Sequence, residues 1–175
     1  NDLYLKREKC KFFKDEVDFC GHTVDKDGIK ISRSKIEAMQ HRPKIKNIGD
    51  IRSYIGTVVW FHSFIPDYSS ITQPLTKLLC KGAKFEWGPD QQAAVDIIQH
   101  LITVAPVLRY YNANLETEVF TDASDYAVGG WIAQKHPDGW HPIVYWSRKL
   151  TLSELNYKTH EKELLPLVEM VEKFD

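Results

Sequence analysis

Apolar and polar residues alternate along the first part of the chain with the period of extended strands. Residues 11–14 and 17–24 alternate or cluster apolar residues around a predicted turn at Asp15-Glu16, and residues 29–31 resume the pattern after a turn-forming run that ends at Gly28. A period of two is typical of a strand that buries one face, and Asp and Gly mark turns between strands. The pattern predicts a β-hairpin with a trailing strand.

The apolar spacing then changes to the period of a helix, and four helices are expected. They are predicted to follow Ser32 or Ser34, to begin near Asn47, to run from about Ile71 to Cys80, and to begin at Gly88-Pro89. Asn47 suits an N-cap position because its side chain can accept a hydrogen bond from a backbone N–H of the first turn. Each helix keeps its apolar residues on one side, so a compact helical bundle is predicted.

The period of two returns in the last third of the chain. Strands are predicted over residues 116–122, 127–134 and 141–147, and a long amphipathic helix over about residues 153–174. Pro166 lies inside that helix, where it removes a hydrogen bond and is expected to kink or break it. Three hairpin-linked strands followed by a helix begin an α+β unit, so the whole chain is predicted to have an α+β fold.

The composition narrows the class of protein. Hydrophobic residues make up 43% and charged residues 27% of the 175 residues, as in ordinary soluble globular proteins. No apolar run approaches the roughly 20 residues that a membrane span needs, and no signal-peptide pattern begins the chain. A soluble intracellular protein without a membrane segment is therefore expected.

The three cysteines are widely spaced. Their odd number predicts free thiols, buried or half-buried, in a reducing compartment. A zinc site from Cys10, Cys20 and His22 is conceivable, although the C-x-x-C spacing typical of such sites is missing.

The net charge of −1 hides an asymmetry along the chain. Residues 1–50 contain 12 Lys and Arg against 9 Asp and Glu, whereas residues 109–175 contain 7 against 11. The basic first stretch suits a phosphate backbone, and the acidic last stretch suits either a solvated surface or carboxylates around a metal. A pI near 6.7 is low for a free-standing nucleic-acid binder, whose domain pI is usually above about 9.

Two carboxylates are candidates for metal chemistry. Asp122 ends a predicted strand beside small residues, and Glu163 lies on the inward side of the last predicted helix. Carboxylates on rigid elements are suitable ligands for Mg²⁺. Each residue also has a plainer explanation, as a turn aspartate and as an exposed helix charge.

A series of short sequence blocks is spread over nearly the whole chain. The blocks include Lys9-Cys10-Lys11-Phe12, Phe19-Cys20-Gly21-His22-Thr23-Val24, Ile51-Arg52-Ser53-Tyr54-Ile55-Gly56, Phe64-Ile65-Pro66-Asp67-Tyr68-Ser69, Phe85-Glu86-Trp87, Thr121-Asp122-Ala123-Ser124-Asp125, Tyr145-Trp146-Ser147-Arg148-Lys149-Leu150 and Glu161-Lys162-Glu163-Leu164-Leu165. Each block alone is ordinary, but in this order they resemble the pol polyprotein of gypsy-type long-terminal-repeat retrotransposons (Metaviridae).

The resemblance implies three domains. Residues 1–32 match the end of a reverse transcriptase palm with its primer-grip hairpin, residues 33–108 the helical thumb, and residues 109–175 the N-terminal half of a ribonuclease H domain. Asp122 and Glu163 match the first two of four carboxylates that bind two Mg²⁺ ions. The expected nucleic-acid contacts are Lys9, Lys11, Phe19, Gly21, His22, Arg52, Trp60 and Phe61.

The function that the resemblance implies is that of a reverse transcriptase and ribonuclease H fragment. It would position a template–primer, with RNA–DNA hybrid and the rest of the pol polyprotein as partners, in a cytoplasmic virus-like particle or the nucleus. The polymerase motif Tyr-x-Asp-Asp is absent from the chain, so catalysis is expected to be incomplete. A non-catalytic retroelement-derived interaction or assembly module is the alternative, and the edge of the strand over residues 116–121 is expected to pair with a second copy or a separate chain.

Overall fold

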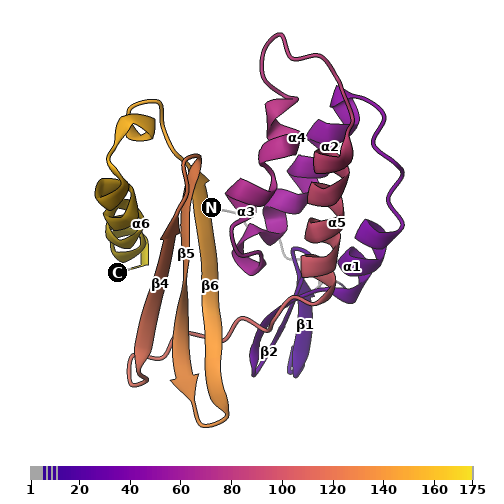
Figure 1. The fold of residues 1–175 in the computed structure, drawn as a ribbon. Helices are drawn as coiled ribbons and strands as arrows, with labels where there is room; N and C mark the ends of the chain where they lie inside the picture. Colours follow the sequence, from indigo (N-terminus) through magenta and orange to yellow (C-terminus); the bar gives the residue numbers. More distant parts are fainter. Residues whose placement is uncertain (1–5, 7, 9, 11, 175) are drawn as a thin grey trace.

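The computed structural model describes residues 6, 8, 10 and 12–174, and it confirms the α+β fold. A small sheet and a helical bundle form one part of the molecule, and a second sheet with one long helix forms the other (Figure 1). Lys9 and Lys11, two of the expected nucleic-acid contacts, lie outside the described residues. No helix in the described part of the chain is long and apolar enough to cross a membrane.

The first sheet is an antiparallel meander. Its strands are β1 (Glu16–Phe19), β2 (His22–Asp25) and β3 (Gly28–Ile31), in that spatial order. Cys20 and Gly21 form the β1–β2 turn with φ angles of 51° and 84°, the positive values that a tight two-residue hairpin turn needs. The predicted turn at Asp15-Glu16 is therefore wrong: the turn divides residues 17–24, and residues 12–14 are not in a strand.

Helices follow directly, and most agree with the prediction. They are α1 (Arg33–Gln40), α2 (Ile48–Val58), the 3₁₀ helix η2 (Val59–Phe64), α3 (Tyr68–Ile71), α4 (Gln73–Lys77) and α5 (Pro89–Thr103). Asn47 caps α2 as expected, since its Oδ1 accepts a 2.9 Å hydrogen bond from the backbone N–H of Asp50. The single helix expected over residues 71–80 is instead divided into α3 and α4, with Pro74 in the first turn of α4.

One apolar core lies between the bundle and the first sheet. Its fully buried members include Ile51, Tyr54, Val58, Phe61, Phe64, Leu75, Ile98 and Ile102. These residues come from α2, η2, α4 and α5, so the bundle and the sheet it rests on form one packed unit.

The second sheet is also an antiparallel meander. It contains β4 (Thr117–Ala123), β5 (Ala127–His136) and β6 (Gly139–Lys149), with β4 at one edge. The 3₁₀ helix η3 (Glu154–Asn156) precedes α6 (Thr159–Phe174). The chain leaves helical geometry at Tyr157, whereas α6 continues through Pro166, so the expected break at the proline is wrong.

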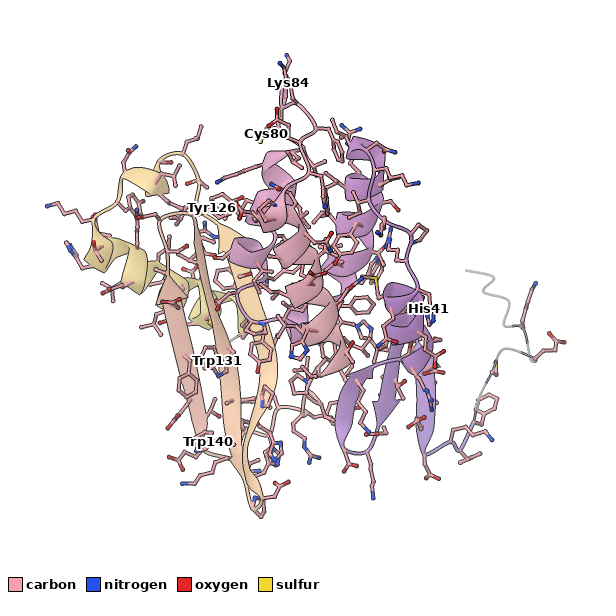
Figure 2. All side chains as sticks on the ribbon, turned by 45° about the vertical axis from the view of Figure 1, so that its right-hand side comes forward. His41, Cys80, Lys84, Tyr126, Trp131 and Trp140 are labelled. Carbon is pink, nitrogen blue, oxygen red and sulfur yellow. The ribbon has the colours of Figure 1, made fainter. Side chains whose placement is uncertain are left out.

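α6 packs against one face of the second sheet. The sulfur of Met170 lies 2.5 Å from the place where a Cβ of Gly130 would stand, so only glycine fits there. On the opposite face Phe120 stacks on Trp131, with ring centroids 4.7 Å apart; Trp131 is labelled on the sheet in Figure 2. α6 therefore covers only one side of the sheet.

The two parts of the molecule are joined by backbone hydrogen bonds. The N–H of Ile29 donates to the carbonyl of Leu108 at 2.8 Å, and the N–H of Leu108 donates back at 2.9 Å. Gly28 has a φ of 148°, and a Cβ there would lie 2.1 Å from the Leu108 carbonyl oxygen. A second contact comes from Ser147 in β6, whose hydroxyl accepts a 2.9 Å bond from the N–H of Ser69.

All three cysteines are free thiols, but Cys20 and Cys80 are exposed. Their expected burial is wrong, because Cys20 occupies the hairpin turn and Cys80 lies in the loop after α4, at one end of the bundle (Figure 2).

Candidate nucleic-acid interface and carboxylate site

The β1–β2 turn is held against the helical bundle by an aromatic contact. The ring of His22 stacks on Phe64, with centroids 5.5 Å apart and an interplanar angle of 16°. It also meets the ring of Phe61 edge-on at 6.2 Å. His22 therefore holds the hairpin against η2. This contact sets the position of the exposed β1–β2 turn.

A hollow of about 310 Å³ lies where this turn meets the bundle. Its lining side chains are Cys20, Lys35, Thr57, Trp60 and Phe61. Trp60 is 61% exposed and Phe61 is 2% exposed. In a 3₁₀ helix, residues three apart share a side, so Phe61 and Phe64 turn into the core while Trp60 turns outward.

The expected contact residues are therefore divided between surface and core. Phe19, Gly21 and Trp60 are accessible, and Phe19 is 68% exposed. Phe61 lines the hollow but is almost wholly buried. Arg52 is exposed on α2 but does not line the hollow.

Lys35 is a member of this site that the sequence did not reveal. Its side chain lies 3.1 Å from the position a Cβ of Gly21 would take, so α1 places a cation directly beside the turn. None of the ion pairs among the described residues involves Lys35. A free cation next to an exposed indole is suited to a sugar–phosphate backbone.

The two candidate metal ligands lie in the second sheet and its helix. Asp122 stands in β4 opposite Gly129, and Glu163 lies early in α6. Lys162, the residue before Glu163, pairs with Asp125 at 3.2 Å, so the start of α6 is close to the end of β4. Both carboxylates are exposed. Across the described residues no group of three or more His, Cys, Asp or Glu could hold a metal ion.

A third carboxylate, Asp67, lies next to Asp122. Asp67 precedes α3 with a φ of 49°, and its Oδ1 is 3.5 Å from the place where a Cβ of Gly129 would stand. Partial burial raises the pKa of Asp67, and the negative charge of Asp122 raises it further. In the sequence Asp67 stands only within one of the family's blocks, and no signal within the chain connected it with a strand 55 residues later.

An arginine anchors the helix that carries Glu163. Arg148 in β6 donates from Nη1 to Glu154 Oε2 at 2.7 Å and from Nε to Glu169 Oε1 at 2.8 Å. The bond from Arg148 holds the pKa of Glu154 at about 2, with help from the backbone N–H of Thr151. The guanidinium therefore ties η3 and α6 to the sheet.

Similarity to known proteins agrees with this architecture. The family described as an RNase H-like domain found in reverse transcriptase matches residues 87–175. The Tf2-3 and Tf2-4 transposon polyproteins of Schizosaccharomyces pombe are each 33% identical to the chain over 168 residues, which is 95% of its length. The chain belongs to this reverse transcriptase family, in its Ty3/gypsy-type retroelement branch. It spans 13% of the length of those polyproteins.

Solved structures share the fold at lower identity. A foamy viral protease–reverse transcriptase in complex with RNA/DNA hybrid matches with a TM-score of 0.76 and 23% identity, over 95% of this chain and 23% of that one. The same kind of enzyme in complex with dsDNA matches with a TM-score of 0.73 and 23% identity, over 92% and 34%. The fold of hairpin, bundle and second sheet is thus shared with these structures.

The Arg148–Glu154 pair should make stability depend on acid. Because the folded-state pKa of Glu154 is about 2, below its ordinary value of 4.5, its contribution is present above pH 4.5 and is lost as the pH falls towards 2. We expect Glu154→Gln to lower the free energy of unfolding at pH 7 and to reduce its fall between pH 4.5 and 2, measured by urea denaturation. Glu118→Gln, an exposed carboxylate on β4, is the control, and equal acid sensitivity in wild type and Glu154→Gln would contradict the assignment.

Proposed function

We propose that this chain positions a template–primer in a retroelement reverse transcriptase and ribonuclease H. In the complete parent it would support RNA-directed DNA synthesis and cleavage of the RNA in RNA–DNA hybrid. The observation that carries the proposal is the hollow at the hairpin turn, where an exposed indole and an unpaired lysine meet on a rigid support. The relatives are transposon polyproteins, and the solved neighbours hold RNA/DNA hybrid or dsDNA.

The proposed site combines a rigid hairpin with side chains that are open to solvent. The tight turn at Cys20-Gly21 and the stacking of His22 on Phe64 leave the hairpin little freedom. Trp60 presents a π face on which a base or sugar can pack, and Lys35 presents a charge for a phosphate. Side chains held in this way position the end of a bound nucleic-acid strand. The polymerase reaction itself takes place in the rest of the parent polyprotein.

Binding of RNA–DNA hybrid tests this proposal. We expect Trp60→Ala and Lys35→Gln each to weaken binding about three- to tenfold, because they remove a stacking surface and a phosphate contact. Only Lys35→Gln should also reduce the dependence of hybrid affinity on salt concentration. Fluorescence anisotropy with a labelled hybrid at several salt concentrations measures both effects.

Matched controls come from the second sheet and its helix. Trp140→Ala removes another exposed indole, and Lys158→Gln removes another exposed charge. Neither should change the affinity. Hybrid binding that is tight, independent of salt, and equally sensitive to Trp140→Ala would rule out the hairpin hollow as the site.

We also assign Asp122 and Glu163 to a divalent metal site. Carboxylates on a strand and a crossing helix fit Mg²⁺, which prefers oxygen ligands and keeps several waters. The two are only part of a set, because two-metal hydrolysis needs ligands around both ions, which lie about 4 Å apart. Bound there, Mg²⁺ would supply a nucleophilic hydroxide and stabilise the leaving oxygen.

Cleavage in the complete parent polyprotein tests the metal assignment. Asp122→Asn should abolish hydrolysis of the RNA in a hybrid and leave primer extension intact, because the polymerase centre is separate. Asp125→Asn, three residues away and paired with Lys162, should retain cleavage. Full cleavage by the Asp122→Asn protein, in an assay of both activities, would remove Asp122 from the metal site.

The outer side of α6 is an uncovered apolar surface. Its exposed residues are Leu164, Leu167, Val168, Val171 and Phe174, and a hollow of about 370 Å³ lies between α6 and the sheet. Contiguous apolar surface favours association. Charges at Glu116 and Glu118 disfavour strand pairing at the β4 edge. In the polyprotein another segment covers the surface, and in the isolated chain a second copy does.

Sedimentation velocity of the isolated chain tests this association. We expect a concentration-dependent dimer that Leu164→Lys/Val168→Lys converts to a monomer, because the two residues are one turn apart on the exposed side of α6. Ile97→Lys, at an exposed isoleucine of α5, should leave the dimer intact. A wild-type monomer at every concentration would contradict the proposal.

A further inference from the structure

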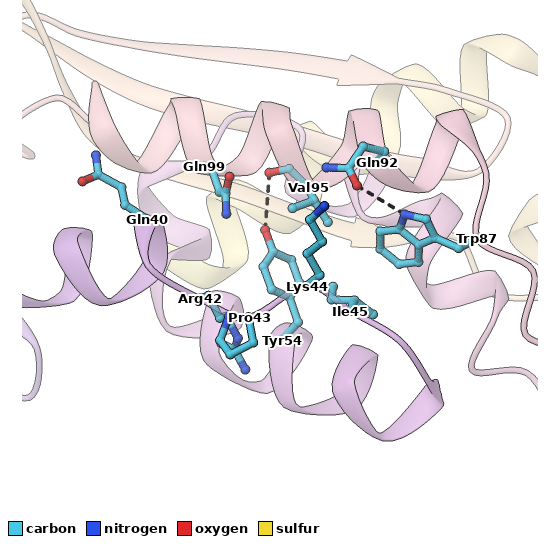
Figure 3. Close-up of a pocket in the computed structure, with 10 residues that line it drawn as sticks. All are labelled: Gln40, Arg42, Pro43, Lys44, Ile45, Tyr54, Trp87, Gln92, Val95 and Gln99. Atoms are coloured by element: carbon cyan, nitrogen blue, oxygen red, sulfur yellow. Dashed lines mark hydrogen bonds between the residues drawn. The ribbon is translucent and has the colours of Figure 1, made fainter.

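A second hollow on the bundle shares no lining residue with the hollow at the hairpin turn. It has a volume of about 440 Å³ and is bounded by the loop after α1, by α2, and by α5 with the segment that precedes it. Figure 3 shows Lys44 beside the ring of Tyr54, whose hydroxyl points to Val95 of α5, with Trp87 at one end. This volume is within the range of about 300–1,000 Å³ that small-molecule sites occupy.

The hollow has a net positive lining. Arg42 and Lys44 line it, and its lining contains neither Asp nor Glu. None of the ion pairs in the described part of the chain includes Arg42 or Lys44. Asp96 accepts a 2.8 Å bond from Gln92 Nε2 and stays outside the lining, and Asp50 lines a neighbouring hollow together with Arg42 and Lys44. Two cations are thus available to an anion.

The arginine is held in place by neutral groups. Its Nη2 donates to Ser53 Oγ at 2.7 Å, and its guanidinium carbon lies 5.4 Å from the centroid of the Tyr54 ring. A guanidinium has five N–H donors, so these contacts leave others for a ligand. No ion pair among the described residues involves Arg42, so these neutral contacts orient its charge for an anion from outside the chain.

Aromatic and amide groups complete the lining. Trp87 donates from Nε1 to Gln92 Oε1 at 3.3 Å, which orients both side chains. Gln99 donates to the carbonyl of Met39 at 3.3 Å, so its amide oxygen faces no partner of its own. The hydroxyl of buried Tyr54 has only a 3.5 Å bond to the Val95 carbonyl, which is long for an O–H donor.

The geometry points to a nucleotide site: the hollow takes a nucleoside 5′-phosphate unit, with the phosphate at Arg42 and Lys44 and the base towards Trp87 and the glutamines. The charge-assisted hydrogen bonds to the phosphate are the strongest interactions in this site. The apolar wall and the fixed amides suit a planar base with donors and acceptors at its edge. An acidic peptide would use the cations but would leave the amides and the indole without matching groups.

The source of the nucleotide unit is either a free nucleotide or the phosphorylated end of a single strand. Both present the same chemistry to the hollow. The site is independent of the hairpin hollow, so Trp60→Ala, which weakens hybrid binding, should leave it unchanged. Failure of hybrid binding and failure of nucleotide binding are therefore separate outcomes.

NMR titration of the isolated chain tests the site. The probes are deoxyadenosine 5′-monophosphate, deoxyadenosine, inorganic phosphate, and a tetradeoxyadenylate with or without a 5′-phosphate. We expect the monophosphate to bind saturably and to shift the indole N–H signal of Trp87 but not that of Trp140. Deoxyadenosine should bind at least about tenfold more weakly, because it lacks the charge-assisted bonds.

Matched charge variants locate the phosphate. Arg42→Gln/Lys44→Gln should weaken the monophosphate by about tenfold or more. Lys81→Gln/Lys84→Gln, which removes the same charge from the loop between α4 and α5, should not. Lys44→Glu is a second variant at an exposed residue without a described side-chain bond, so it tests the site even if Arg42 is needed for folding.

The results of these titrations test the proposed site and identify the source of the nucleotide unit. A phosphorylated tetranucleotide that binds as well as the monophosphate identifies a strand end, whereas binding of the monophosphate alone identifies a free nucleotide. Equal affinity for deoxyadenosine and its monophosphate would overturn the site. So would unchanged affinity in the charge variants, no saturable shift at millimolar concentrations, or tighter binding of an acidic tetrapeptide.

Discussion

The backbone pairing of Ile29 with Leu108 is the contact on which the arrangement of this chain depends. Two hydrogen bonds of 2.8 and 2.9 Å join the end of the first sheet to the segment that leaves α5 and enters β4. Gly28 permits this approach, since any side chain there would meet the Leu108 carbonyl. Because both partners are backbone groups, which must be paired when buried, the junction does not depend on one side chain.

This junction places the hairpin turn and the carboxylates on a common support. The bundle core lies between them, with His22 packed on η2 at one side and Ser147 bonded to Ser69 at the other. Tyr145 of β6 packs against the same core. Close-packed interiors resist displacement, so the spacing between the hairpin turn and the carboxylates is set by the packing of the bundle.

The sequence predicted elements better than it predicted contacts. The Asn47 cap and the two changes of hydrophobic period identified the bundle and both sheets. The turn predicted at Asp15-Glu16 was wrong because the turn lies at Cys20-Gly21, a pair that lacks the Asn-Gly or Asp-Gly signal most typical of a two-residue hairpin. Burial of Phe61 beside exposed Trp60 also escaped prediction, because a helical pattern does not reveal where the period shortens from 3.6 to 3.0 residues.

The sequence by itself determined the local elements and the order of the family's blocks, because caps, turns and periodicity act over a few neighbouring residues. Only the tertiary structure decided which side chains meet. It placed Lys35 beside Gly21, Asp67 beside Asp122, and Arg148 between Glu154 and Glu169. It also gathered Arg42, Tyr54 and Trp87 around one hollow. Apart from Arg148 and Glu154, six residues apart, these groups are more than ten residues apart along the chain, and their proximity follows from packing around the core.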